Sequence, residues 1–337
     1  MSVPYRNTLI VLFLCIGFIT FAIGVKVHRT VAANPSLMVK VIKPALLAQA
    51  PRSPEHDLPF SNLSKATTIA VTPQKAPAPA TEAAVDVAVS RPGVPGVTAR
   101  AYIAGNIETG EIYEEYHPSA VLPVASMSKL VTAFVATNEL SLDDTIKITK
   151  EATNVPPDKS ALNEGEYFTV RELLQPLLLA SSNVAAEALL STIDRANFLE
   201  LMSSYSWEIG MPSTFFADPS GVSPQNVASA HDLFALAKYL YISRPDILEI
   251  TRTTGTEIAT TTEHGSHTFP STHPFASDPR FIGGKTGRTP EAGDTMLTIL
   301  RIKNQATAIV VLGSKYEGRA ADTRLLAGKV ESLLGGN

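Results

Sequence analysis

The stretch LPVASMSKLVTA, residues 122–133, decides what kind of domain this chain can form. It places Ser126 at the start of an apolar run and Lys129 three residues later. We predict a helix from about Ser126 to Leu140, and residues three apart on a helix share one face. A serine hydroxyl becomes an effective nucleophile when a neighbouring base removes its proton. Ser126 and Lys129 are therefore candidates for a nucleophile and its base.

Lysine can act as that base only in its neutral form. Its ordinary pKa of ~10.4 must then fall towards 7–8, a change that corresponds to about 4 kcal/mol supplied by the surroundings. Burial and a second cation nearby both shift the pKa in that direction. The pattern S-x-x-K also arises by chance on helix surfaces, so alone it does not establish a catalytic site.

Two further motifs follow in the chain. Ser181-Ser182-Asn183 comes after an apolar run, and Lys285-Thr286-Gly287 follows Gly283-Gly284 and leads into a predicted strand. The first could supply a proton relay and an amide donor, although a helix N-cap explains it equally well in isolation. The second could hold a carboxylate beside a backbone that substrate can approach closely. Its simpler interpretation is a glycine turn with an exposed lysine.

The N-terminal part of the chain has a different composition. Thr8–Val25 contains eighteen residues without a charge, which as a helix would span about 27 Å, close to the thickness of a bilayer core. We predict a membrane anchor or signal segment over residues 1–30; cleavage near residues 31–33 is the alternative to retention. Ten of the 24 prolines lie between Pro35 and Pro95, which predicts a disordered linker over residues 31–97.

Residues 98–337 are predicted to form one globular domain of the α+β class. Strands at both ends with helices between them favour an antiparallel sheet shared by the two ends and flanked by helices. Residues Thr169 to Glu172 form a predicted capping box, which opens a helix with the apolar sequence LLQPLLLA. The other expected elements are strands at 99–106, 111–116, 295–302 and 307–312 and helices at 184–191, 230–242 and 321–334.

Composition excludes several classes of function. The net charge is −4 and no basic run occurs, so nucleic acid is not an expected partner. The single cysteine, Cys15, lies in the N-terminal apolar segment, so the globular part has no thiolate metal site and no cysteine nucleophile. His264, His267 and His273 cluster loosely in the sequence. A zinc site is one interpretation of them, but without H-E-x-x-H we favour a polar loop.

Taken together, S-x-x-K, S-x-N and K-T-G in this order form the set shared by penicillin-binding proteins and active-site-serine β-lactamases. The sequence resembles the low-molecular-weight D-alanyl-D-alanine carboxypeptidases over residues 98–330. Beyond residues 122–133, three stretches carry the resemblance: LLQPLLLASSNVAAEAL at 173–189, DPSGVSPQNVASAHDL at 218–233 and GGKTGRTPEAG at 283–293. The resemblance implies a β-lactamase/transpeptidase-like fold with an additional all-helical subdomain.

The resemblance also implies a reaction. Ser126 would attack the carbonyl between two D-alanines of a peptidoglycan stem peptide and form an acyl-enzyme. Lys129 would accept the serine proton, and Ser181 would pass a proton to the departing D-alanine. β-Lactams would act as inhibitors by acylating Ser126. Neither a cofactor nor a metal is implied.

Substrate binding is assigned by the same resemblance. Asn183 would orient the substrate amide, and Lys285 and Thr286 would bind the terminal carboxylate beside Gly287. The backbone N–H groups of Ser126 and Arg288 would form the oxyanion hole. The implied location is the bacterial cytoplasmic membrane, with the catalytic domain outside the cytoplasm.

Some features depart from the family pattern or leave alternatives open. Val184 follows the second motif where the family often has aspartate, and Arg288 follows K-T-G where an aromatic residue or histidine is common. A β-lactamase would need a deacylating glutamate in an E-x-x-L-N context, and the text between Ser181 and Lys285 contains none. A D,D-endopeptidase is not separated from a carboxypeptidase by sequence. A catalytically silent peptidoglycan-binding protein is disfavoured because it need not keep all the motif residues.

Overall fold

The computed structural model describes residues 93–155 and 160–336. The predicted membrane segment and nearly all of the predicted linker lie outside the described residues. Within those two ranges, no helix combines the length and the apolar character needed to cross a membrane.

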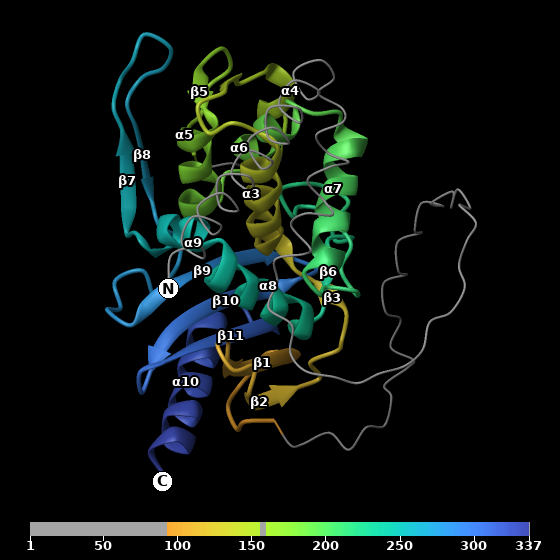
Figure 1. The fold of residues 1–337 in the computed structure, drawn as a ribbon, viewed down its shortest axis with the longest axis vertical. Helices are drawn as coiled ribbons and strands as arrows, with labels where there is room; N and C mark the ends of the chain where they lie inside the picture. Colours follow the sequence, from red (N-terminus) through yellow and green to blue (C-terminus); the bar gives the residue numbers. More distant parts are fainter. Residues whose placement is uncertain (1–92, 156–159, 337) are drawn as a thin grey trace, which may run out of the picture. The chain divides into compact units, whose positions relative to one another are not determined.

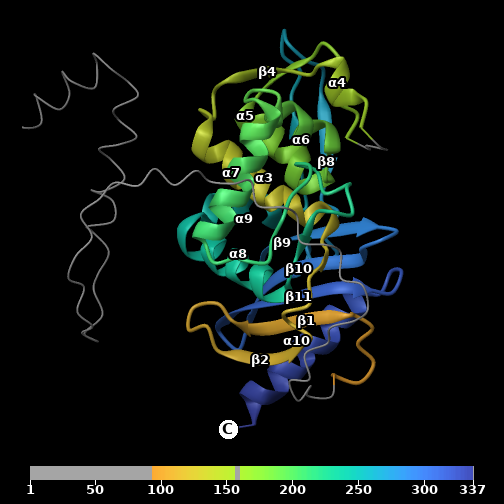
Figure 2. The ribbon, with the colours of Figure 1, turned by 90° about the vertical axis from the view of Figure 1, so that its right-hand side faces the viewer.

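A five-stranded sheet joins the two ends of the domain. Its strand order is β2-β1-β11-β10-β9, and every neighbouring pair is antiparallel. Figure 2 shows this order, with β9 nearest the helices and β2 at the far edge. The prediction that the first and last strands share one sheet is confirmed. The strands are β1 (Ala101–Asn106), β2 (Ile112–Tyr116), β9 (Phe281–Thr289), β10 (Gly293–Ile302) and β11 (Gln305–Ser314).

Both faces of this sheet are covered, so its central strands read as nearly continuous apolar runs. Successive side chains of a strand point to opposite faces. Ile103 and Val310 accordingly pack with the main helical core, whereas Tyr102 and Val311 pack with the C-terminal helix α10 (Arg319–Gly335). The strand interiors are therefore buried on both sides.

The other helices form the rest of the domain, and the central one, Ser128–Glu139, is buried from Ser128 to Ala136. The helix Ala230–Ser243 packs on one face of the sheet, against β11 and β1, and the others lie towards and beyond β9 (Figure 1). They are α3 (Ser128–Glu139), α4 (Lys150–Thr153), α5 (Val170–Gln175), α6 (Asn183–Leu190), α7 (Arg195–Glu208), α8 (Ala230–Ser243) and α9 (Pro245–Arg252).

Short paired strands connect the helical part. Three two-stranded sheets pair β3 (Leu122–Pro123) with β6 (Val227–Ala228), β4 (Thr145–Lys147) with β5 (Tyr167–Thr169), and β7 (Gly255–Ile258) with β8 (His267–Pro270). The β7–β8 hairpin runs alongside α5, away from the five-stranded sheet (Figure 1).

The predicted helix after the capping box is interrupted. Thr169 and Glu172 do form the capping box that opens α5, as predicted. At Pro176, however, the helix widens into a π-helical segment, η2 (Pro176–Ala180). Proline lacks the N–H that an α-helix needs and its ring crowds the preceding turn, which favours the wider winding. The segment ends at Ser181, whose φ of 62° lies in the left-handed region.

Candidate active site

Ser126 lies in a short 3-10 helix, η1 (Ala125–Met127), rather than in the first turn of the α-helix that follows it. The preceding residue, Ala125, has a φ of 50°, an unfavourable value for a residue with a Cβ. Two glycines make room for this turn. A Cβ on Gly221 would overlap the carbonyl oxygen of Ala125, and one on Gly287 would lie 2.9 Å from the Ser126 nitrogen. The nucleophile segment is thus clamped between the 218–226 loop and β9.

Lys129 is completely buried, and its Nζ reaches three oxygen atoms. It lies 3.0 Å from Ser126 Oγ, 2.7 Å from Asn183 Oδ1 and 2.5 Å from the carbonyl oxygen of Ser220. A neutral amine has two N–H groups and one lone pair. If the two N–H groups donate to Asn183 and Ser220, the lone pair faces the Ser126 hydroxyl. The arrangement therefore suits removal of the serine proton by Lys129.

Lys285 brings the second and third motifs together. Its Nζ donates to Ser181 Oγ at 2.8 Å and to the carbonyl oxygen of Thr286 at 3.0 Å. Burial holds the pKa of Lys285 well below its ordinary value, and the positive charges of Lys129 and Arg319 lower it further. A donor aimed at Ser181 Oγ leaves the serine hydroxyl able to donate its own proton elsewhere. Lys285 and Ser181 thus form a chain along which a proton can move.

The guanidinium group of Arg288 is held in place by two contacts. It forms a two-pronged ion pair with the buried carboxylate of Asp294, its partner across the strands, and stacks over the Tyr316 ring at 4.3 Å from the centroid. The hydrogen bond and charge of Asp294 raise the pKa of Arg288. The side chain of Arg288 is therefore held at the end of β9 while its backbone lies beside Gly287.

Arg319 is a site residue that the sequence did not reveal. It is the first residue of α10, and its Nη1 donates to the carbonyl oxygen of Gly287 at 2.7 Å. Burial lowers the pKa of Arg319, Asp294 opposes that shift, and Arg288 adds to it. A cation at a helix N-terminus opposes the helix dipole. This unfavourable position of a cation is the one sequence feature that indicates a role for Arg319 outside its own helix.

The 218–226 loop supports the nucleophile from behind, a role that the sequence did not predict. The Asp218 carboxylate accepts N–H bonds from its own turn, including Ser220 N at 2.7 Å, which directs the Ser220 carbonyl towards Lys129. Asn226 is fully buried and donates to Ser128 Oγ at 3.0 Å. Asp218 shapes the backbone of this turn and Asn226 ties it to Ser128, so only their spacing in the DPSGVSPQN sequence could have indicated them.

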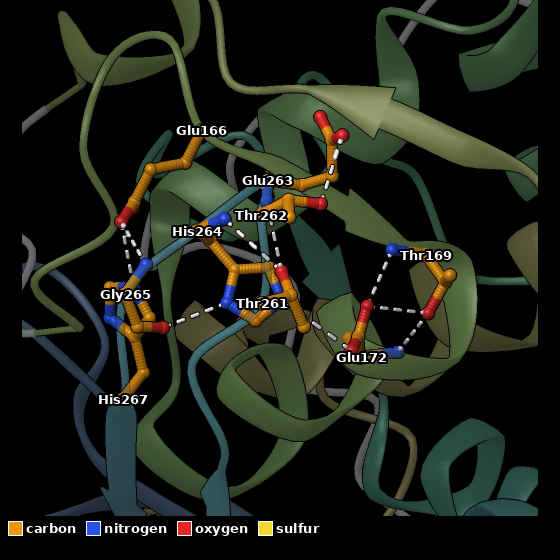
Figure 3. Close-up of polar contacts among 9 residues, drawn as sticks. All are labelled: Glu166, Thr169, Glu172, Thr261, Thr262, Glu263, His264, Gly265 and His267. Carbon is orange, nitrogen blue, oxygen red and sulfur yellow. Dashed lines mark hydrogen bonds and ion pairs between the residues drawn. The ribbon is translucent and has the colours of Figure 1, made fainter.

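The three histidines are buried; His264 and His273 lie in loops, as predicted, whereas His267 begins β8. His267 Nε2 lies 2.9 Å from Glu166 Oε1, and His264 Nε2 lies 3.6 Å from Glu172 Oε1 (Figure 3). The His264 ring also stacks on Phe168, with 4.3 Å between centroids. These contacts attach the tip of the β7–β8 hairpin to the segment around β5 and α5. The described residues include no group of three or more histidine, cysteine or acidic side chains arranged to hold a metal ion.

His273 lies at the base of the hairpin beneath the third motif. Its Nε2 is 3.1 Å from the carbonyl oxygen of Leu297, and Phe275 N donates to its Nδ1 at 3.3 Å. Burial lowers its pKa to about 3, the Leu297 carbonyl opposes the shift, and the charges of Lys285 and Arg319 add to it. The contacts define a neutral ring that donates through Nε2.

This histidine predicts a destabilisation in mild acid. Below pH ~6.5 the unfolded chain binds a proton at His273 that the folded state, with a pKa of about 3, does not bind. The free energy of unfolding should therefore fall with decreasing pH, by about 1.4 kcal/mol per unit at most, from ~6.5 towards ~3. Chemical denaturation of wild type and His273→Gln between pH 4 and 7 tests this. His273→Gln should lose this pH dependence of the free energy of unfolding, whereas the control His231→Asn, which replaces an exposed histidine, should keep it. The same pH dependence in wild type and His273→Gln would contradict the prediction.

Comparison with known proteins agrees with this arrangement. The family of D-alanyl-D-alanine carboxypeptidases, peptidase S11, matches residues 87–316. A D-alanyl-D-alanine endopeptidase of Haemophilus influenzae is 30% identical over 226 residues, which cover 64% of this chain and 76% of that protein. The D-alanyl-D-alanine carboxypeptidase DacF of Bacillus subtilis is 25% identical over 229 residues, covering 65% of this chain and 59% of that protein.

A solved structure gives the same answer for the fold. Penicillin-binding protein D2 of Listeria monocytogenes in its ampicillin-bound form is similar with a TM-score of 0.62 and 29% sequence identity, covering 71% of this chain and 99% of that one. The fold is therefore transpeptidase-like, and the resemblance drawn from the motifs is confirmed. The chain belongs to the D-alanyl-D-alanine carboxypeptidase family, peptidase S11, and is a serine-type D,D-peptidase.

Proposed function

We propose that this protein is a penicillin-binding D-Ala-D-Ala carboxypeptidase that acts on peptidoglycan stem peptides through an acyl-enzyme on Ser126. The observation that carries the proposal is the position of Lys129 Nζ, 3.0 Å from Ser126 Oγ and bonded to Asn183 Oδ1 at 2.7 Å. Catalysis of acyl transfer needs a nucleophile, a base and an orienting group within hydrogen-bond reach.

Acylation begins when Ser126 Oγ attacks the carbonyl between the two D-alanines and its proton passes to Lys129. The backbone N–H groups of Ser126 and Arg288 stabilise the negative charge that develops on the carbonyl oxygen, with about 3–4 kcal/mol for each donor. Ser181 donates a proton to the amine of the departing D-alanine, and Lys285 donates to Ser181 Oγ. Water then hydrolyses the Ser126 ester and releases the shortened peptide.

The cations around β9 bind the substrate's terminal carboxylate. Lys285 is buried and Arg319 is half-buried there, and the positive charge of Arg319 lowers the pKa of Lys285. An incoming carboxylate relieves that repulsion and accepts a hydrogen bond from Thr286 Oγ1. Asn183 accepts a hydrogen bond from Lys129 through its Oδ1, and we assign its side-chain amide the role of orienting the substrate backbone.

The endopeptidase alternative is favoured by a specific observation, the 30% identity to the Haemophilus influenzae endopeptidase. Endopeptidase and carboxypeptidase activities use the same acylation chemistry and differ in the group that leaves. Incubating the protein with a D-Ala-D-Ala pentapeptide and, separately, with purified cross-linked dimer tests the two. Release of D-alanine from the pentapeptide is the expected result. Dimer cleavage without D-alanine release would assign an endopeptidase, and no reaction with either would overturn the proposal.

Penicillin should acylate Ser126 and leave slowly. The opened ring keeps its leaving group tethered, so fast hydrolysis would require a dedicated base that holds a water. Glu187 is the nearest glutamate after the second motif, and its carboxylate is paired with Arg195 at 2.7 Å. We expect an adduct that lasts minutes or longer in intact-mass spectrometry. A short-lived adduct with rapid accumulation of hydrolysed penicillin would instead indicate a β-lactamase.

The site of action follows from the same substrate. We propose that the catalytic domain, residues 98–337, lies outside the cytoplasm of a bacterial cell, where stem peptides of the wall are exposed. Residues 1–30 would hold it at the cytoplasmic membrane through the linker 31–97.

A further inference from the structure

Thr272 lies between the second and third motifs and contacts both segments. Its backbone N–H and its hydroxyl both donate to the carbonyl oxygen of Leu179, at 3.0 and 3.1 Å, two residues before Ser181. Its Oγ1 also lies 3.2 Å from Oγ1 of Thr286. The hydroxyl of the third-motif threonine therefore has a second hydroxyl as its neighbour.

The backbone that carries Thr272 is fixed at several points. It follows β8 after one residue, Ser271, and the tip of that hairpin is held by the His267–Glu166 and His264–Glu172 contacts (Figure 3). At the base, the buried His273 ring bridges from its own loop to the carbonyl oxygen of Leu297, and Leu297 is the strand partner of Lys285. Thr272 is thus held in register with the third motif by residues on either side of it.

The two hydroxyl groups can adopt two complementary proton arrangements. Each threonine has one proton to donate and lone pairs to accept with. Without substrate, Thr272 donates to Leu179 O and Thr286 donates to Thr272. With a carboxylate bound, Thr286 can donate to it while Thr272 donates to Thr286, and the Thr272 N–H still satisfies Leu179 O. Each hydroxyl proton has an acceptor in both states, and hydrogen bonds in a chain strengthen one another.

We propose that Thr272 is a positioning residue that orients the Thr286 hydroxyl towards the substrate's terminal carboxylate. This inference rests on the proposed function and concerns the carboxylate-binding part of the same site. Thr272 does not touch the reacting atoms; it acts through Thr286. Because the interaction persists from the bound substrate to the transition state, its loss should raise KM and leave kcat nearly unchanged.

The test compares Thr272→Val with Thr272→Ser on a D-Ala-D-Ala pentapeptide with a free terminal carboxylate. Valine matches the shape of threonine but has no hydroxyl, whereas serine keeps the hydroxyl. We expect KM to rise about two- to tenfold in Thr272→Val, the range for one hydrogen bond, and to return close to the wild-type value in Thr272→Ser. Thr268→Val, an exposed position on the same hairpin, serves as the matched control and should behave as wild type. Thermal unfolding of each variant shows whether the fold is intact.

A double-mutant cycle separates positioning from a structural effect. The same pentapeptide with an amidated C-terminus lacks the carboxylate charge, so wild type should prefer the free acid and Thr286→Val should show a weaker preference. Thr272→Val should also weaken that preference, but should weaken it no further in the Thr286→Val background, because the two residues act on one contact.

Additive losses of this preference in the double variant, or an unchanged preference in a folded Thr272→Val, would overturn the inference. Both outcomes require that the wild-type protein is active on the pentapeptide. A wild-type protein that neither releases D-alanine nor binds penicillin would refute the proposed function itself.

Discussion

Replacing Ser126 with alanine should abolish acylation and reduce kcat by about six orders of magnitude, as loss of a catalytic serine can do. The Ser126 hydroxyl lies 3.0 Å from Lys129 Nζ, and that lysine keeps its contacts with Asn183 and Ser220 when the hydroxyl is removed. The fold should therefore survive the change. Incubation with fluorescent penicillin, followed by intact-mass spectrometry, measures the loss directly.

Ser128 provides a matched control for this variant. It lies two residues away, and its hydroxyl donates to the carbonyl oxygen of Ala125 and accepts from Asn226 instead of contacting Lys129. Ser128→Ala should still be labelled by penicillin. Labelling of Ser126→Ala at the wild-type level would show that another residue is the nucleophile and would remove the basis of the proposed reaction.

The sequence predicted the elements whose pattern is local. The capping box at Thr169 and Glu172 was readable because its two members stand three residues apart. Four strands of the five-stranded sheet, β1, β2, β10 and β11, were predicted because their sequence pattern contrasts with the turns between them, whereas the glycine-rich β9 has no such pattern. The pairing of β1 with β11 followed from the general preference of an α+β domain for joining its terminal strands.

The elements that were missed depend on contacts distant in sequence. The β7–β8 hairpin has a threonine- and histidine-rich text, and Ile258 and Phe269 are its main inward apolar residues, so its alternation is weak. Burial of His264 and His267 depends on Glu166 and Glu172, about 100 residues earlier in the chain.

The same limit applies to the site. Ser126 and Lys129 were identifiable because one helix turn brings them together, whereas Thr272 and Arg319 reach β9 from a hairpin base and a helix terminus. No spacing rule links those two positions to Thr286 and Gly287, the residues they contact. Three-dimensional packing alone makes them neighbours of the third motif.

Lys129→Arg should inactivate the protein nearly as completely as loss of Ser126, although the positive charge is retained. The physical reason is that a guanidinium, with a pKa above ~12, stays protonated and has no lone pair with which to accept the serine proton. The site also has no room for it, because Lys129 is fully buried and its Nζ already meets Asn183 Oδ1 and Ser220 O at 2.7 and 2.5 Å.

Two readouts separate loss of the base from loss of the fold. Thermal unfolding reports any cost of the larger side chain, and Lys129→Ala, which removes charge and bulk together, should be comparably inactive. Non-covalent binding of the pentapeptide should persist in the folded variants, since Lys285, Thr286 and Arg319 are unchanged, while the penicillin acylation rate falls by several orders of magnitude. A folded Lys129→Arg protein with near wild-type acylation would mean that a different group deprotonates Ser126. The hydrogen-bonded pair of Lys285 and Ser181 would then be the next candidate for that base.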